Sequence, residues 1–224
     1  MKIKSLGYLW IESTDVSKWR DYGTNILGLQ IAPTMPADGN VYLKMDARPY
    51  RFAVYPGERD RFAFAGWELE SEEAFAAALE ELRAAGVAFE LPGADIARQR
   101  RVRAVARLQD PAGATLELYH GADLDYAKFI SPQGIAEFET GFNGNMGLGH
   151  IVLPTKKLAE TRRFYREVLG FADTDYMHFH FSPDAKDPGQ GLHFMHVDNP
   201  RHHSLALYED PNDSPSGCVH AMVE

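Results

Sequence analysis

Two histidines of this chain, His150 and His220, lie in apolar runs with the character of β-strands, Leu148–Leu153 and Cys218–Val223. Neutral imidazole is a common protein ligand for iron, zinc, copper and nickel. A histidine in an apolar strand can equally be a hydrogen-bonded core residue. An internal repeat of the sequence favours the first of these two interpretations.

The segment Leu6–Ile11 recurs without a gap as Leu148–Leu153, so that His150 stands where the first copy has Tyr8. If the opening strands of the second and fourth repeat units are aligned, Trp67 corresponds to His220. The second half would then carry nitrogen ligands where the first half has aromatic rings. We therefore expect His150 and His220 to converge on one metal ion.

The first half also indicates what a complete site would contain. Glu117 follows Trp67 by 50 residues (117 − 67). The same spacing beyond His220 predicts a glutamate at about position 270, after Glu224. Two histidines and one carboxylate leave open positions on the metal, which is diagnostic of non-haem Fe(II) oxygenases. We expect Tyr8, Trp67 and Glu117 to hold no metal, and Glu117 to be structural.

The 224 residues given would then supply only two of three ligands, so this sequence is expected to be a partial record of a longer protein or a defective remnant. We expect it to bind Fe(II) poorly and to be weakly active or inactive by itself.

Other histidines could take part in chemistry without binding the ion. His203, at the start of a strand-like run, could be an acid or base that lines the cavity, or it could only bond the preceding turn Asn199–Arg201. His193 and His196 have opposite parity along one predicted strand and should face opposite sides of the sheet, so we do not expect them to share an ion.

The elements that must position these residues follow one repeated order. The first 120 residues contain two successions of strand, helix and short strands, with helices expected over 16–26 and 71–86. Helix caps are expected at Ser13–Asp15 and Ser71, and turns at Asp38-Gly39 and Asp110–Gly113. A third unit has a helix over 158–168 and strands at His150–Leu153, Met177–Phe181, Leu192–Val197 and Ser204–Tyr208. The fourth unit contributes only its first strand.

This order predicts an α+β fold of paired βαβββ modules in which the fourth module is incomplete. Residues 1–120 would form an N-terminal domain of two modules without metal, 121–145 a polar linker, and 146–224 the catalytic domain. A pair of such modules curls into an incomplete barrel, so two opposed strands can direct side chains into one cavity.

Composition excludes several classes of function. The 32 acidic and 23 basic residues give a net charge of −9, which disfavours nucleic acid as a partner. The local basic run is expected to be a solvated face; it contains Arg98, Arg100, Arg101, Arg103 and Arg107. No apolar run approaches the ~20 residues that span a bilayer, so no membrane association is expected. With Cys218 as the only cysteine and no signal sequence, a reducing cytoplasm is expected.

Four motifs together resemble one known family. They are Met146–Leu153, Phe164–Phe171, Asn199–Ala206 and Val219–Glu224, and the resemblance extends to Ser5–Tyr8. They closely resemble the two-domain, type I extradiol ring-cleavage dioxygenases of the vicinal oxygen chelate superfamily, which share the glyoxalase-like fold. Within that family the chain looks most like enzymes that open 2,3-dihydroxybiphenyl or steroid-derived catechols.

The resemblance implies an activity and a set of site residues. His150 and His220 would be Fe(II) ligands, His203 the catalytic histidine, and Val152 and Phe194 part of the substrate pocket, which His203 also lines. The third ligand, a glutamate, would lie beyond residue 224. The substrates would be O₂ and a small aromatic diol, a bicyclic or substituted catechol, in aromatic compound catabolism. A homo-oligomer is expected for the full-length protein.

Two other functions stay open from the sequence. A metal-free module of the same superfamily that sequesters a ligand could lack the third ligand, but it would not need His150, His203 and His220. A glyoxalase-like isomerase or epimerase usually has carboxylates among four ligands, whereas this chain supplies two histidines in one half only.

Overall fold

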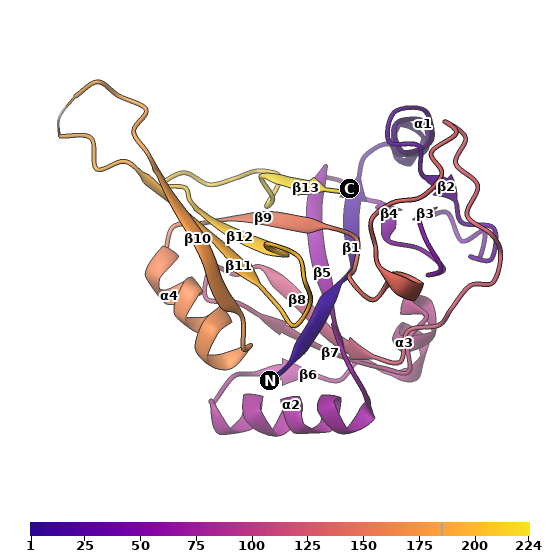
Figure 1. The fold of residues 1–224 in the computed structure, drawn as a ribbon, viewed down its shortest axis with the longest axis horizontal. Helices are drawn as coiled ribbons and strands as arrows, with labels where there is room; N and C mark the ends of the chain where they lie inside the picture. The colour runs from indigo at the N-terminus through magenta and orange to yellow at the C-terminus, as the bar shows by residue number, and fades with distance from the viewer. Residues whose placement is uncertain (185) are drawn as a thin grey trace.

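The computed structural model describes residues 1–184 and 186–224, which form two β-sheets and the helices that cover them (Figure 1). One sheet has the strand order β2-β3-β4-β1-β5-β8-β7-β6, and the other has the order β10-β11-β12-β9-β13. The predicted α+β class is therefore confirmed. None of the helices in the described residues is long and apolar enough to cross a membrane.

The first module begins with a long strand and a capped helix. Its elements are β1 (Ile3–Ser13), α1 (Val16–Asn25), β2 (Gln30–Ile31), β3 (Val41–Lys44) and β4 (Phe52–Pro56). Helix α1 starts after Asp15, whose carboxylate accepts hydrogen bonds from the backbone N–H groups of Ser17 and Lys18. An acceptor at this position satisfies N–H groups that have no partner within the helix.

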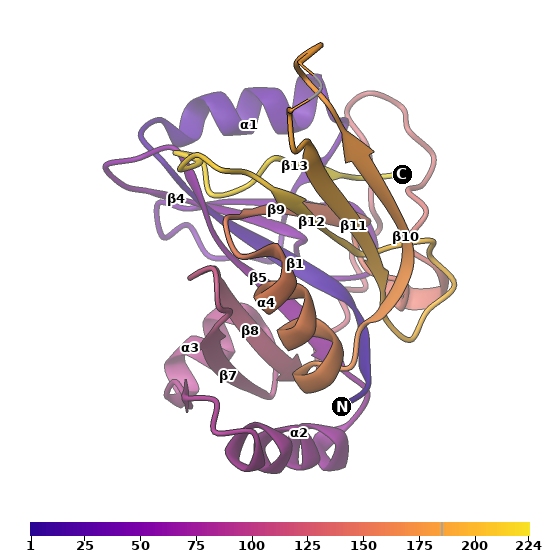
Figure 2. The ribbon, with the colours of Figure 1, turned by 90° about the vertical axis from the view of Figure 1, so that its left-hand side faces the viewer.

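The second module repeats the order with one additional helix. Its elements are β5 (Arg61–Leu69), α2 (Glu72–Ala84), β6 (Phe89–Glu90), α3 (Ala94–Arg100), β7 (Ala104–Gln109) and β8 (Thr115–His120). The predicted cap Ser71 accepts a hydrogen bond from Ala74 N at 3.2 Å, and α2 packs beneath the sheet (Figure 2). Helix α3, of seven residues, was not expected from the sequence.

The second sheet contains the third module and the start of another. After a 3₁₀ turn, η1 (Phe142–Gly144), come β9 (His150–Thr155), α4 (Leu158–Arg163), the π-helical turn η2 (Phe164–Val168), β10 (Ala172–Phe179), β11 (Gln190–His196), β12 (Leu205–Glu209) and β13 (His220–Met222). The expected strand Met177–Phe181 in fact begins at Ala172. The β10–β11 hairpin extends away from the body of the molecule (Figure 1).

Strand pairing is repeated between the two sheets. Strand β1 runs parallel to β4 and antiparallel to β5, and β9 runs parallel to β12 and antiparallel to β13. With Tyr8 equivalent to His150, these registers make Phe64, which lies opposite Trp10, the equivalent of His220, which lies opposite Val152.

The alignment of Trp67 with His220 is therefore wrong by three residues. An odd shift moves a side chain to the other face of a sheet. Trp67 is fully buried in the main core, where its ring lies 5.0 Å from that of Phe171, whereas Tyr8 belongs to a separate cluster. Strand β5 nevertheless supplies an aromatic equivalent of His220, which is Phe64.

The main apolar core is continuous through both halves of the chain. It includes Leu6 and Leu9 of β1 together with Leu148, Ile151 and Leu153 near and in β9. Residues 121–141 contain no assigned helix or strand. The division into domains at 1–120, 121–145 and 146–224 stays a prediction.

Candidate active site

His150 and His220 meet where β13 pairs with β9. His150 begins β9 and is buried, and His220 begins β13 and is exposed. In the antiparallel register Met222 lies opposite His150, and His220 lies opposite Val152. The two Nε2 atoms are 3.1 Å apart. Residues two apart on a strand share a face, so this register directs both rings to the same side of the sheet.

The approach of the two strands depends on glycine next to His150. Gly149 has φ +139°, and a Cβ built there would lie 1.9 Å from the carbonyl oxygen of Met222. No other residue could be placed there without moving β13. Gly149 thus permits the close approach that brings His220 to His150.

His203 and Phe194 complete a compact cluster with His150. His203 lies two residues before β12, and its ring centroid is 4.1 Å from that of His150 and 4.9 Å from that of Phe194. Its Nδ1 atom is 3.0 Å from Nδ1 of His202. The preceding turn is closed by Asn199, which accepts a hydrogen bond from Arg201 N at 3.0 Å, so His203 is not needed to bond it.

Val152 and Phe194 belong to a row of side chains that crosses the sheet next to the histidines. Val152 on β9 lies opposite Ala206 on β12, and Ala206 lies opposite Phe194 on β11. Val152 is buried, and Phe194 is half-buried. The row forms an apolar floor beside His220.

The environment keeps the central rings neutral. Burial is the largest cause that lowers the pKa of His150 to about 3, followed by the nearby His203, His220 and Arg201. Burial also lowers the pKa of His203, followed by the effect of His202. Near pH 7 both rings therefore have a lone pair that can bind a metal ion or accept a proton.

His150 and His220 match part of the ligand geometry that a metal ion requires. With metal–nitrogen bonds of about 2.1 Å, two imidazoles at a right angle would place their nitrogens about 3.0 Å apart, close to the observed 3.1 Å. Among the residues that the structure describes, no group of three or more His, Cys, Asp or Glu side chains is arranged to hold an ion. His150 and His220 therefore offer two adjacent donors of a larger ligand set. The carboxylate expected near position 270 falls outside the sequence given.

The remaining histidines of the cluster 193–203 point to other partners. His193 stacks on Tyr176, with ring centroids 5.9 Å apart. Nδ1 of His196 lies 2.7 Å from Oγ1 of Thr174. His193 and His196 therefore have different neighbours, and the expectation that they share no ion stays a prediction.

The corresponding position in the first half contains a closed polar network. Glu117 is fully buried and accepts a hydrogen bond from Tyr8 Oη at 2.7 Å. Arg100 donates to both oxygens of Glu117, and Arg107 donates to one of them. Burial, followed by the charge of Glu117, raises the pKa of Tyr8 well above its ordinary value.

This network corrects one expectation about the basic run. Arg100 is only 5% exposed and lies over the ring of Trp10, so it does not belong to a solvated face, whereas Arg98 is exposed. Both oxygens of Glu117 are occupied by arginines, which supports its expected structural role.

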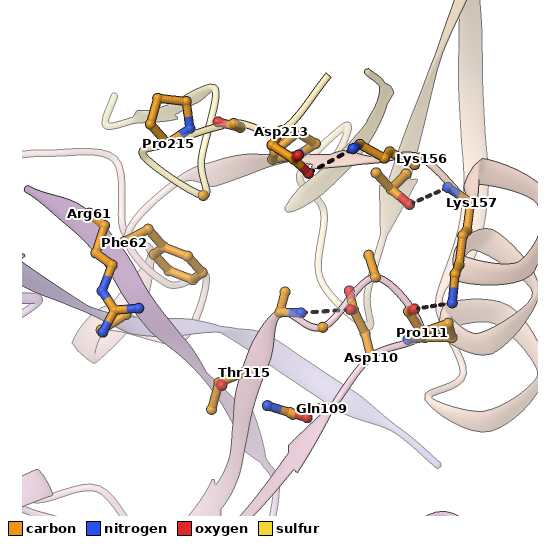
Figure 3. A pocket seen from close by; sticks show the side chains of 18 of the residues that line it. Arg61, Phe62, Gln109, Asp110, Pro111, Thr115, Lys156, Lys157, Asp213 and Pro215 are labelled. Carbon is orange, nitrogen blue, oxygen red and sulfur yellow. Dashed lines mark hydrogen bonds and ion pairs between the residues drawn. The ribbon is translucent and has the colours of Figure 1, made fainter. Parts of the chain in front are cut away.

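A polar cleft of about 860 Å³ lies elsewhere, between the β7–β8 turn, the β9–α4 junction and the loop before β13 (Figure 3). Lys156 pairs with Asp213 at 2.7 Å, and Lys157 donates to Pro111 O at 3.1 Å. His150, His203 and His220 do not line this cleft. The size of this cleft therefore does not mark it as the site of the chemistry, because none of the three clustered histidines lines it.

Two family descriptions match the chain. Residues 6–57 match the family described as dihydroxybiphenyl dioxygenase BphC D1. Residues 147–223 match the glyoxalase/bleomycin resistance protein/dioxygenase superfamily. One match falls in each half of the internal repeat.

Curated relatives match over the whole chain. An iron-dependent extradiol dioxygenase of Rhodococcus jostii RHA1 is 42% identical over 100% of this chain and 73% of its own length. A biphenyl-2,3-diol 1,2-dioxygenase of Paraburkholderia xenovorans LB400 is 36% identical over 100% of this chain and 72% of its own length.

Solved structures agree with these relatives. A catechol 2,3-dioxygenase superposes with a TM-score of 0.88 at 30% identity, covering 100% of this chain and 75% of the other. A Mn(II)-bound glyoxalase from Novosphingobium aromaticivorans superposes with a TM-score of 0.69 at 15% identity, over 93% of this chain and 62% of the other, and shares the fold alone.

Proposed function

Because this chain belongs to the extradiol ring-cleavage dioxygenases of the vicinal oxygen chelate fold, we propose that His150 and His220 bind its catalytic metal and that His203 is its proton-transfer residue. The family is made up of oxidoreductases that open catechol-type rings with O₂ and use a catalytic metal. We propose Fe(II) as that metal. The observation that carries the proposal is the pair of Nε2 atoms 3.1 Å apart, beside a third imidazole.

The substrate that fits this surrounding is a catechol with an apolar substituent, such as 2,3-dihydroxybiphenyl. The row of Val152, Ala206 and Phe194 offers apolar contact next to the histidines for a second ring. Relatives named for biphenyl-2,3-diol support this substrate class.

Fe(II), held by His150 and His220, would supply Lewis-acid chemistry for the reaction of the aromatic diol with O₂. His150 contributes a lone pair near pH 7 because burial disfavours its protonated form. His203 is likewise neutral, and it can accept a proton from a substrate hydroxyl and return it later. Phe194 packs against His203 and limits its rotation.

A homo-oligomeric full-length protein in the cytoplasm, without nucleic acid or membrane partners, stays a prediction. The alternative of a metal-free sequestering module would leave the three clustered imidazoles without a role.

Separate measurements of metal binding and rate test the proposed roles. Single variants His150→Ala, His220→Ala and His203→Ala of the full-length protein, which would include the third ligand, are titrated anaerobically with Fe(II), and bound iron per chain is measured after desalting. We expect His150→Ala and His220→Ala to lose the iron that the unmodified full-length protein retains, and His203→Ala to keep it. Ring cleavage of 2,3-dihydroxybiphenyl, followed by visible absorbance, should fall about 10²–10⁴-fold in iron-loaded His203→Ala.

His196→Ala is a matched control, because His196 contacts Thr174 and does not touch the cluster. Iron binding that survives removal of either His150 or His220 would reject the ligand assignment. An iron-free His203→Ala variant would make His203 a ligand, and an iron-loaded variant with undiminished rate would remove its proposed role.

A further inference from the structure

Arg201 joins the three chain segments that carry the clustered histidines. Its side chain is almost completely buried, and Nε donates to Met146 O at 3.1 Å. Nη2 donates to the carbonyl oxygens of Gly147 and Glu139, and Nη1 pairs with the carboxylate of Glu224.

Each contact lies close to one histidine along the chain. Met146 and Gly147 precede His150 by four and three residues (150 − 146, 150 − 147), and Glu224 follows His220 by four (224 − 220). Arg201 itself lies two residues before His203 (203 − 201). One guanidinium therefore contacts the segment before His150 and the segment after His220 while its own backbone leads into His203.

An equivalent buried arginine–glutamate pair occurs in the first half of the chain. The β1–β4 and β9–β12 registers make Phe52 equivalent to Leu205, and counting back along the chain matches Tyr50 with His203 and Arg48 with Arg201. The β1–β5 and β9–β13 registers make Gly66 equivalent to Met222, and counting forward matches Glu68 with Glu224. Arg48 is buried and donates to both oxygens of Glu68, at 2.9 and 3.1 Å.

The turns that carry the two arginines are also closed in the same way. Arg48 N donates to Asp46 Oδ1, and Arg201 N donates to Asn199 Oδ1, both at 3.0 Å. The arginine–glutamate pair is thus a repeated element of the fold, and in the second half it lies beside three imidazoles.

We propose that Arg201 is a positioning residue that holds His203 against His150 and keeps β13, with His220, in register with β9. A planar guanidinium presents its five N–H donors in a rigid fork, so it can satisfy acceptors from several segments at once. A lysine has the same charge but not this fork. The proposal rests on the proposed function for the roles of the three histidines, and its geometric part can be measured without metal.

The test uses the metal-free 224-residue chain with ¹⁵N-labelled histidine and compares Arg201→Lys with the matched control Arg48→Lys. In the unmodified chain the ring protons of His150 and His203 should show a nuclear Overhauser effect (NOE), because their centroids are 4.1 Å apart. We expect Arg201→Lys to lose this signal and Arg48→Lys to keep it. Co(II) titration of the full-length protein is the second readout: the affinity for Co(II) should fall about 10–100-fold in Arg201→Lys and stay unchanged in Arg48→Lys.

The NOE comparison tests the positioning role of Arg201 even if the proposed function is wrong. An unmodified full-length protein that binds no Co(II) would count against the metal-site proposal, and the NOE comparison would still stand. An Arg201→Lys variant that keeps the NOE overturns the positioning role, and so does an equal loss in Arg48→Lys. If Arg201→Lys does not fold, Glu224→Gln is compared with Glu68→Gln: a weaker NOE in Glu224→Gln alone supports the proposal, and any other result overturns it.

Discussion

The two halves of this chain place different side chains on equivalent strands, and the difference separates a scaffold from a site. In the first half Tyr8, Tyr50 and Phe64 occupy the positions of His150, His203 and His220, and Glu117 is bound by two arginines. The charge of Glu117 is thus offset by arginines within the same network. In the second half His150 and His220 approach each other through their Nε2 atoms, and the clustered rings form no ion pair with a carboxylate in the described part of the chain.

The largest expected effect comes from giving the second half the side chains of the first. The triple variant His150→Tyr, His220→Phe, Met222→Gly reproduces Tyr8, Phe64 and Gly66. The glycine is included because Gly66 lies opposite Tyr8 and leaves room for its ring. In the full-length protein we expect circular dichroism to show a preserved fold and metal analysis to show complete loss of Fe(II) binding. A triple variant that still binds Fe(II) would contradict the comparison.

Breaking the neutral network of the first half should have the next largest effect. Glu117→Gln removes the countercharge of Arg100, which is buried, and of Arg107. Removing one partner of a buried ion pair costs about 3–5 kcal/mol, so the free energy of unfolding in urea should fall by that amount. Glu90→Gln, which removes an exposed partner of Arg107, is the control and should cost about 0–1 kcal/mol. Equal losses of stability in the two variants would show that the buried network contributes no more to the fold than an exposed ion pair.

A smaller effect is expected from filling the space opposite Tyr8. A Cβ at Gly66 would lie 2.2 Å from the Tyr8 ring, so Gly66→Ala should lower the free energy of unfolding by about 1–3 kcal/mol. In a double-mutant cycle with Tyr8→Ala, the added methyl group should cost little once the ring is absent. Additive losses in that cycle would place the strain elsewhere.

The smallest effect concerns pH. The folded-state pKa of His150 is about 3, against an ordinary value of 6.5. Between these values the unfolded chain binds a proton that the folded chain does not, so this group makes the free energy of unfolding fall as pH decreases below 6.5. Urea unfolding at pH 7 and pH 5 should show a smaller pH dependence in His150→Phe than in the unmodified chain. Equal pH dependence would mean that His150 is not protected from protonation.

Much of the fold could be predicted because local signals and the repeat agree. Ser71 with two following glutamates marked the start of α2, and the Leu6–Ile11 repeat identified β9. Aligning the opening strands of the repeat units placed His150 and His220 on neighbouring strands, and their Nε2 atoms do meet, although the alignment of His220 with Trp67 was out of register by three residues. Their role as ligands stays a prediction, together with the roles of His203, Val152 and Phe194.

Other features depend on registers and long-range contacts that sequence patterns do not contain. Trp67 could not be excluded as the equivalent of His220, because irregularities in the β1–β5 pairing change the register between Leu6 and Tyr8. The burial of Arg100 required knowing that α3 packs near Glu117. The correspondence of Arg48 with Arg201 is visible in the sequence as Asp46-Ala47-Arg48 and Asn199-Pro200-Arg201, yet it has meaning only once β4 and β12 are recognised as equivalent.

Gly149 implies a separation between two kinds of mutational sensitivity. Any side chain there meets the backbone of β13, so a library of substitutions at position 149 should reduce the amount of folded protein in cells. His150, the next residue, contributes a ring whose loss should spare abundance and remove turnover. If one variant library is scored for both abundance and ring cleavage, substitutions of Gly149 should lower abundance, whereas substitutions of His150 should lower ring cleavage alone.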